Sequence, residues 1–230
     1  YGGCFVGGKA YLAGNRARMP LHDKDKGLTD AELAALRGTS DKFALNARFH
    51  DEVEHIKGRP DAGISQEVFD CVEDARVAAI GSYLMRGVQD NLTAELGQHC
   101  IEKGFDNVVR QEDSPLGEAV GFYIREQLIG DLPKPATDIL NLWRDHIHSQ
   151  VGNQVEALGD AMYDQEAFAK LAHKMIYDLG LSDQWGEENS DADSEDQDAE
   201  AEEVETETGS ESSDQEMSAD ADLSDAIEGE

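Results

Sequence analysis

The chain has few of the features that would tie it to a membrane or to an oxidising compartment. It contains only three cysteines, Cys4, Cys71 and Cys100, which lie far apart and form no CxxC pair. An odd, scattered set of cysteines is typical of a reducing compartment. No apolar run approaches the roughly 20 residues that span a bilayer, and no basic stretch followed by an apolar one indicates a signal peptide. The sequence therefore predicts a cytoplasmic protein with no membrane partner.

Basic residues are also scarce. The 230 residues include 50 acidic and 19 basic side chains, a formal net charge of -31. Residues 187–230 hold 20 of the acidic residues and no Lys or Arg, which leaves a net charge of -11 on residues 1–186. No basic stripe is present to neutralise phosphates, so we expect no nucleic-acid partner.

Three regions follow from the pattern of glycines, apolar residues and charges. Residues 1–28 are rich in glycine, and the turn signals Gly7-Gly8 and Gly14-Asn15 predict a small β-hairpin or extended entry. Residues 29–182 have a helical period and predict a compact multi-helix domain, so the fold class is mainly α. Residues 183–230 have too few apolar residues to offset the entropy of ordering and predict a disordered acidic linker. Because the chain begins and ends in the middle of such patterns, we expect a fragment of a longer protein.

Helix ends are predicted by capping residues and glycines. Thr29 and Glu32 form an S/T-x-x-E capping box at the start of one helix. Gly38 and Ser40 are expected to kink or split this helix, and Gly58 and Pro60 to end it. Ser65 is expected to cap the next helix. That helix carries an apolar stripe made of Val68, Val72, Ala75, Ala79 and Tyr83.

The later helices have similar signals. Ser114 and Pro115 suit the N-cap and first position of one helix. Asp164 is expected to cap the last helix, which Gly180 closes. Between them, Pro133 and Pro135 precede a helix with Trp143 on its apolar side.

Residues 49–55, "FHDEVEH", have the composition of a metal site. His50 and His55 are five positions apart, which on one intact helix separates them by roughly 140°. The zincin pattern H-E-x-x-H needs a spacing of four. We therefore interpret the stretch as a solvated helix face and expect no metal ligand in it. The alternative is a stand-alone metalloenzyme in which His50 binds an ion with nearby carboxylates and a ligand from elsewhere.

Two other patterns come close to known motifs and fail. "GCFVGGKA", from Gly3 to Ala10, fits G-x-x-x-x-G-K, but Ala10 stands where a nucleotide-binding loop has the hydroxyl that ligates Mg²⁺. In the acidic segment a calcium-loop pattern has Asp196 where glycine is needed. Glu73 and Arg76, three apart, suit an ion pair on a helix surface. We expect no catalytic, cofactor-binding or metal-binding residue in this chain.

Whole segments nevertheless resemble a known family. "GNRARMPL", "LTDAELAALRGTSDKFALNARFHDEVEH", "VFDCVEDARVAAIGSYLMRGVQDNL" and "DSPLGEAVGFYIREQL" resemble the N-terminal region of the CobT subunit of aerobic cobaltochelatase. The likeness covers about residues 5–182 and continues into that family's acidic linker. The family's C-terminal von Willebrand A domain, with its D-x-S-x-S metal motif, is absent from these 230 residues. The positions that match the family's E-x-x-R…G…M-x-G…N pattern are Glu73, Arg76, Gly81, Met85, Gly87 and Asn91.

The resemblance implies a subunit of an ATP-dependent ligase that forms nitrogen–metal bonds. Such a complex inserts Co²⁺ into the corrin ring of hydrogenobyrinic acid a,c-diamide in aerobic cobalamin biosynthesis. ATP and Mg²⁺ would belong to an AAA+ ATPase partner and the tetrapyrrole to a large partner subunit, with this chain as a non-catalytic coupling subunit. Residues expected at a partner interface are His50, Glu73, Arg76 and Asn91, with helix stability as the alternative for each.

A different class of function is compatible with the charge. An acidic-tailed interaction or chaperone-like protein would use residues 187–230 to attract basic partners and would have no chelatase role.

Overall fold

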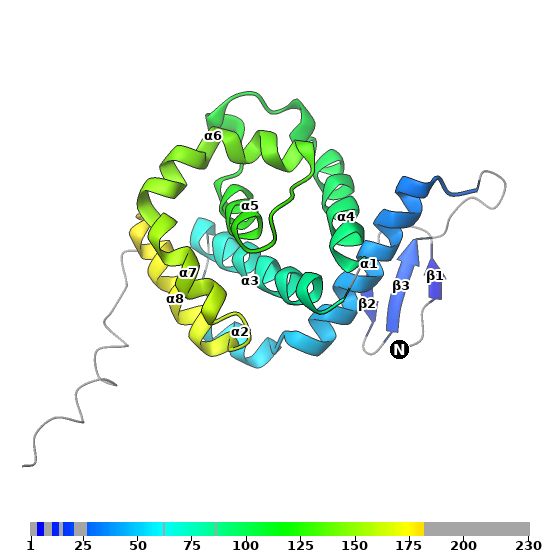
Figure 1. The fold of residues 1–230 in the computed structure, drawn as a ribbon, viewed down its shortest axis with the longest axis horizontal. Coiled ribbons are helices and arrows are strands. Elements are labelled where there is room, and N and C mark those ends of the chain that lie inside the picture. The colour runs from blue at the N-terminus through cyan, green and yellow to red at the C-terminus, as the bar shows by residue number, and fades with distance from the viewer. Residues whose placement is uncertain are drawn as a thin grey trace, which may run out of the picture. The chain divides into compact units, whose positions relative to one another are not determined.

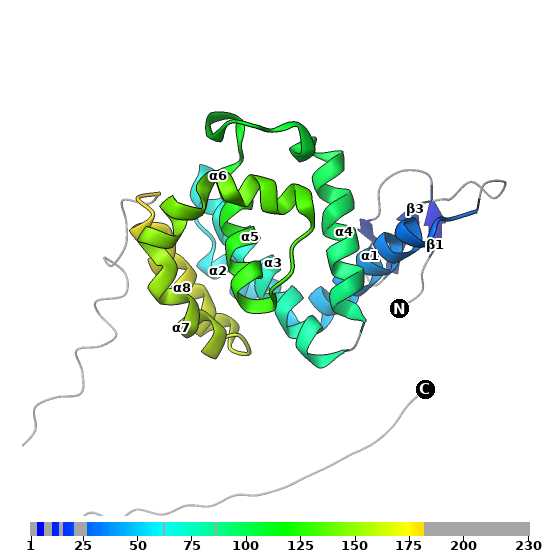
Figure 2. The ribbon, with the colours of Figure 1, turned by 45° about the horizontal axis from the view of Figure 1, so that its top comes forward.

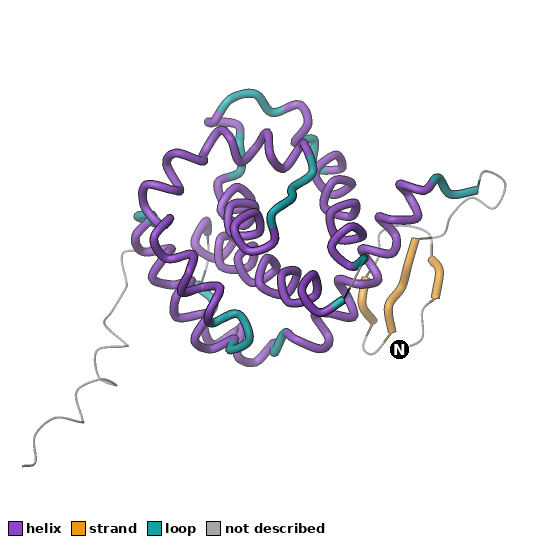
Figure 3. Tube along the Cα trace, in the orientation of Figure 1, coloured by secondary structure: helices purple, strands orange, loops and turns teal. Residues whose placement is uncertain are grey.

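The computed structural model describes residues 4–6, 11–13, 16–20, 27–61, 63–85 and 87–181. Over these residues, eight α-helices follow three short strands (Figure 1; Figure 3). The predicted mainly α fold is confirmed. The predicted acidic linker, residues 183–230, lies outside the described residues. None of the helices described is both long enough and apolar enough to cross a membrane.

The strands form one small sheet in the order β1-β3-β2. Strand β2 (Tyr11–Ala13) pairs antiparallel with β3 (Arg16–Pro20), with Tyr11 opposite Arg18. This pair is the predicted hairpin, and it flanks the second turn signal rather than the first. Strand β1 (Cys4–Val6) runs parallel to β3, so it is not a hairpin partner of β2. Met19 of β3 is buried and lies 4.0 Å, sulfur to hydroxyl, from Ser40 of the first helix.

Helix α1 (Asp30–Phe49) begins at the predicted capping box. The Thr29 hydroxyl accepts from the Glu32 amide at 3.2 Å, and the Glu32 carboxylate accepts from the Thr29 amide at 2.8 Å. The expected split at Gly38 and Ser40 is wrong, since the helix runs unbroken for 20 residues. Gly38 instead allows α1 to approach helix α4 (Val88–Glu102) closely. A Cβ at this position would lie 2.1 Å from the carbonyl oxygen of Asn91.

The helix break falls elsewhere, between Phe49 and Glu52. His50 and Asp51 both have extended backbone, with φ near -110° and -101°, and a separate helix α2 (Glu52–Gly58) follows. The Asp51 carboxylate accepts from the amides of Val53 and Glu54 at 2.8 and 3.2 Å, which caps α2. The sequence prediction of one helix to Gly58 missed this because Asp51 was not recognised as an N-cap.

Helices α3 (Gly63–Leu84) and α5 (Leu116–Ile129) lie at the centre of the helical body (Figure 1; Figure 2). They pack closely because Gly121 faces the Cys71 backbone and side chain, where a Cβ would lie 2.7 Å from the Cys71 Cβ. The expectation that Ser65 caps α3 is wrong. Ser65 lies within α3, which begins at Gly63, and its hydroxyl donates to the Leu181 carbonyl at 2.6 Å. Of the predicted α3 stripe the first four members are buried, whereas Tyr83 is 63% exposed.

Four further helices surround this pair: α4, α6 (Lys134–Val151), α7 (Val155–Asp160) and α8 (Gln165–Asp178) (Figure 2). The Asp164 carboxylate caps α8 as predicted, accepting from the Ala167 amide at 3.0 Å. Gly180 follows α8 with φ of +70°, a conformation that favours glycine. Helix α5 starts one residue later than predicted, with Pro115 at its N-cap.

Candidate functional site

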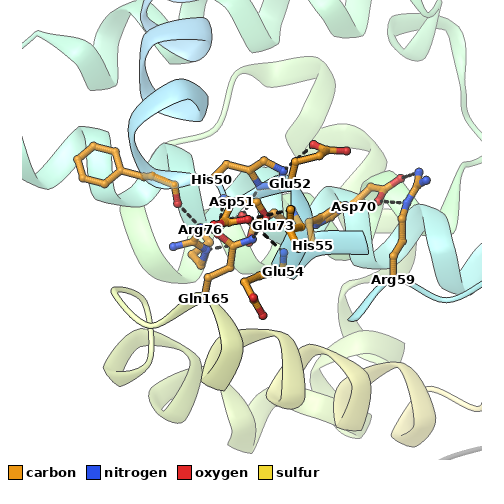
Figure 4. A network of polar contacts seen from close by, with 12 residues as sticks. His50, Asp51, Glu52, Glu54, His55, Arg59, Asp70, Glu73, Arg76 and Gln165 are labelled. Carbon is orange, nitrogen blue, oxygen red and sulfur yellow. Dashed lines mark hydrogen bonds and ion pairs between the residues drawn. The ribbon is translucent and has the colours of Figure 1, made fainter. Parts of the chain in front are cut away.

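The polar centre of the body lies where α1 and α2 meet α3 (Figure 4). Since the chain turns at His50 and Asp51, the two histidines of "FHDEVEH" are not on one helix. Their ring centroids lie 4.8 Å apart, with an angle of 59° between the ring planes. The argument that a spacing of five separates the imidazoles is therefore wrong, because it assumed an unbroken helix.

Glu73 of α3 completes this cluster. Its Oε1 lies 2.7 Å from His50 Nδ1. One ligand atom each from His50, His55 and Glu73 can be chosen so that all three lie within 4.8 Å of one another. The side chains of His50 and His55 are 17% and 11% exposed, and that of Glu73 is 9% exposed.

Glu73 also forms an ion pair with Arg76, and the pair is buried rather than on the surface as expected. Arg76 Nε donates to Glu73 Oε2 at 2.7 Å, and Nη2 donates to Oε1 at 2.8 Å. Arg76 is 1% exposed. A two-point contact of this kind fixes the carboxylate in orientation as well as in charge.

Through Nη1 and Nη2, Arg76 also holds three other parts of the chain. These nitrogens bind the carbonyl of Phe49 at 2.6 Å, the carbonyl of Met162 at 3.0 Å and the side-chain oxygen of Gln165 at 3.2 Å. Gln165 in turn accepts from the Asp51 amide at 2.8 Å and donates to the Asp51 carbonyl at 2.9 Å. The helix break is thus held between α3 and the start of α8.

His55 is oriented by a second carboxylate. Its Nε2 lies 2.9 Å from Asp70 Oδ1, and Arg59 Nε donates to the same oxygen at 2.7 Å. Burial acts to raise the pKa of Asp70, but the hydrogen bonds from Arg59 and His55 outweigh it and hold that pKa below its usual range. The carboxylate is therefore ionised at neutral pH and accepts a proton-bearing nitrogen from His55.

The structure brings together three of the four residues predicted at a partner interface and leaves out the fourth. Asn91 lies on α4, where its amide donates to Asp41 of α1 at 2.8 Å. Glu73 and Arg76 are buried and hold helices together inside the body. This structural role is enough to explain why they match the family's E-x-x-R pattern. Partner contact through any of the four stays a prediction.

A second polar feature lines a small cavity between α1, α3, α4 and α5. The cavity measures about 150 Å³, and Lys42, Asp74, Glu95 and Arg125 contribute to its wall. Burial lowers the pKa of Arg125, and its Nε and Nη2 have no hydrogen-bond partner among the described residues. This volume suits a few water molecules and is below the range of about 300–1,000 Å³ typical of small-molecule sites.

Neither cysteine of the helical body is an activated thiol. Cys71 and Cys100 are free. Burial raises the pKa of Cys100 to about 12 and moves the pKa of Cys71 further above its usual range.

Arg125 was not predicted from the sequence as a residue of interest, although it lies among the buried residues of α5. A basic residue within an apolar helix was the available signal.

Fold and site together define a helical domain that continues into a strongly acidic segment and carries a His–His–Glu cluster at a helix break. A model of the family described as cobalamin biosynthesis protein CobT matches residues 4–230, so the chain belongs to that family. Membership makes it a protein of cobalamin biosynthesis and a cobaltochelatase subunit. No solved structure matches the chain.

Proposed function

We propose that this chain is the part of a CobT-type subunit that couples an AAA+ ATPase to cobalt insertion. In this proposal the ATPase binds ATP and Mg²⁺, and a large partner subunit binds the corrin, hydrogenobyrinic acid a,c-diamide. The complex places Co²⁺ in the ring in the cytoplasm, and this chain contributes docking and positioning rather than the chemical step. The observation that carries the proposal is the family match over residues 4–230.

The division of labour is consistent with the described body. The cavity of about 150 Å³ beside Arg125 is too small to enclose a tetrapyrrole. The body's polar network is used to hold helices together, as the burial of Arg76 shows. The free thiols of Cys71 and Cys100 accord with a reducing compartment.

One surface of the body suits a protein partner. An apolar groove of about 370 Å³ lies beside the ends of α1 and α3 and includes Leu84 and Met85. These side chains are 55% and 43% exposed, and the adjacent Tyr83 is also exposed. Met85 belongs to the pattern that the chain shares with the family, yet packing within this body does not account for it. We propose this groove as the docking surface for the ATPase subunit.

The proposal is tested by co-purification of the full-length subunit with its AAA+ ATPase. We expect a complex that forms with ATP or a non-hydrolysable analogue and weakens without nucleotide. Absence of association under every nucleotide condition would contradict the coupling role.

A variant locates the contact. Met85→Glu places a charge in the groove and is expected to weaken association at least about tenfold, the cost of burying an unpaired charge. Val109→Glu is the matched control, because Val109 is 80% exposed and lies outside the groove. Equal effects of the two substitutions, with the fold intact by circular dichroism, would place the docking surface elsewhere.

A further inference from the structure

The His–His–Glu cluster has ligands from two separate segments. His50 lies at the break between α1 and α2, His55 lies within α2, and Glu73 projects from α3 (Figure 4). Their chosen ligand atoms lie within 4.8 Å of one another. Ligands at 2.0–2.2 Å from an ion in tetrahedral geometry are roughly 3.4 Å apart. The cluster is thus up to roughly 1.4 Å wider than a closed tetrahedral site.

The surroundings of His55 suit a metal ligand. Asp70 accepts from Nε2 at 2.9 Å, so Nε2 carries the hydrogen and Nδ1 keeps its lone pair. A carboxylate on the second nitrogen is the usual companion of a metal-binding histidine, because it fixes the tautomer and the ring orientation. Arg59 holds that carboxylate in turn, with its Nε 2.7 Å from Asp70 Oδ1.

His50 has an unbalanced environment that a cation would resolve. Its Nδ1 lies 2.7 Å from Glu73 and its Nε2 lies 3.2 Å from Glu52. A neutral imidazole can donate from one nitrogen only, so both contacts form together only when a second proton or a bound cation supplies a positive charge. A bound divalent ion next to one nitrogen supplies that charge and shares the carboxylate with it.

Access and charge also favour an ion. The side chain of Glu52 is 71% exposed, so the cluster opens to solvent on that side, while the other three groups are mostly covered. Arg76 neutralises Glu73 and Arg59 pairs with Asp70, so Glu52 adds one negative charge at the open side of the cluster.

We propose that His50, His55 and Glu73 form a binding site for one divalent first-row transition metal ion of the Co²⁺, Ni²⁺ or Zn²⁺ type. Two imidazoles and one carboxylate select these ions over Mg²⁺ and Ca²⁺, which prefer oxygen ligands. Three protein ligands leave at least one position for water or an exchanging ligand, unlike a closed structural site. The ion joins the α1–α2 junction to α3. The proposal does not depend on the coupling role, since it concerns only residues of this chain.

The test is a titration of the chelator-treated 230-residue chain with Co²⁺ in the presence of millimolar Mg²⁺. Excess Mg²⁺ occupies the carboxylates of the acidic segment, so the signal reports sites that contain imidazole. Calorimetry is expected to show one Co²⁺ per chain, with a visible absorption change typical of nitrogen ligation. Binding of several weak ions that Mg²⁺ abolishes would overturn the proposal.

Variants assign the ligands. His55→Ala is expected to weaken Co²⁺ binding at least about tenfold, and Asp70→Asn by about 10- to 100-fold through loss of the orienting carboxylate. His146→Ala, which removes an exposed histidine of α6, should leave binding unchanged. Unchanged affinity in His55→Ala would overturn the proposal.

A measurement on the unaltered chain covers the case in which these variants unfold. Paramagnetic Co²⁺ should selectively broaden the ring proton signals of His50 and His55 in the NMR spectrum, at one equivalent of ion, and leave those of His146 sharp. Uniform or absent broadening of the histidine signals would contradict the site.

Discussion

At the scale of single residues, Arg76 is the side chain that most strongly ties the functional centre to the fold. It neutralises the buried Glu73 and binds two backbone carbonyls and one side-chain oxygen. A buried charge that loses its partner cannot be resolvated without opening the structure. The loss of Arg76 should therefore cost more stability than the loss of a residue from the surface ion pair that the i, i+3 spacing suggests.

Replacement of Arg76 by Met tests this. Met has a similar length and no charge, so Arg76→Met leaves the buried Glu73 without its arginine partner and with only His50 beside it. We expect the free energy of unfolding to fall by about 3–5 kcal/mol. Urea unfolding followed by circular dichroism measures the change.

Lys170→Ala provides the comparison, because Lys170 pairs with Glu166 at 3.2 Å and its side chain is 62% exposed. Its unfolding midpoint should scarcely move. The double variant Glu73→Gln, Arg76→Met should recover part of the loss, since no unpaired charge remains. Additive effects of the two substitutions would show that the pair does not act as a unit.

At the scale of helices and strands, the sequence predicted those elements whose signals are local. The Thr29–Glu32 capping box and the Asp164 cap were found because each needs only side chains within three residues. The break at His50–Asp51 was missed although its N-cap, Asp51, is also a local signal, because the apolar period continues across it. The contacts that hold the break come from Arg76 and Gln165. Such contacts join residues far apart in the chain.

The same limit applies to the candidate site. The residue types were visible in "FHDEVEH", but the third ligand, Glu73, is 23 residues from His50, and no spacing rule joins them. The interpretation that excluded a metal ligand used the angle between positions on a continuous helix. Asp51 caps a new helix, so the helix is not continuous and that angle does not apply. Asp is a common capping residue, but the sequence does not show that a cap here brings the two imidazoles together.

The glycine at the contact between α3 and α5 allows a prediction about how these helices pack. Gly121→Ala places a Cβ 2.7 Å from the Cys71 Cβ and 3.1 Å from its carbonyl oxygen, which forces α5 away from α3. We expect a destabilisation of about 1–3 kcal/mol, the usual cost of overpacking a core. Thermal or urea unfolding measures it.

Gly159→Ala is the matched substitution, because this glycine also lies in a helix but its added Cβ meets only a Leu128 methyl at 3.6 Å. The higher helix propensity of alanine should leave the protein unchanged or up to about 1 kcal/mol more stable. Equal destabilisation by both substitutions would show that the α3–α5 contact is not the tight one.

At the scale of the whole molecule, charge and recognition separate along the sequence. Residues 187–230 carry 20 acidic and no basic residues, whereas the proposed docking groove and metal cluster both lie in the helical body. The coupling role and the chaperone-like alternative therefore assign partner binding to different parts of the chain. A tether raises the local concentration of linked domains without contacting the partner itself.

Deletion of residues 187–230 distinguishes the two roles. If the body recognises the ATPase, the shortened chain still associates with it, with little dependence on salt. If the acidic segment is the recognition element, deletion abolishes association and the binding of the longer chain falls steeply between about 0.05 and 0.5 M salt, as expected for screened surface charges. Pull-down over a salt series measures both.

A second form of the protein separates the effect of the segment's length from the effect of its charge. In this form residues 187–230 are replaced by an uncharged Gly/Ser segment of equal length. Under the coupling role this form binds the ATPase as the original chain does, because that role requires only a spacer of the same length in place of residues 187–230. Both shortened and neutralised forms should lose binding to a basic probe such as polylysine, which depends on charge alone. Loss of ATPase binding in the neutralised form would assign recognition to the acidic side chains and contradict docking through the groove beside Met85.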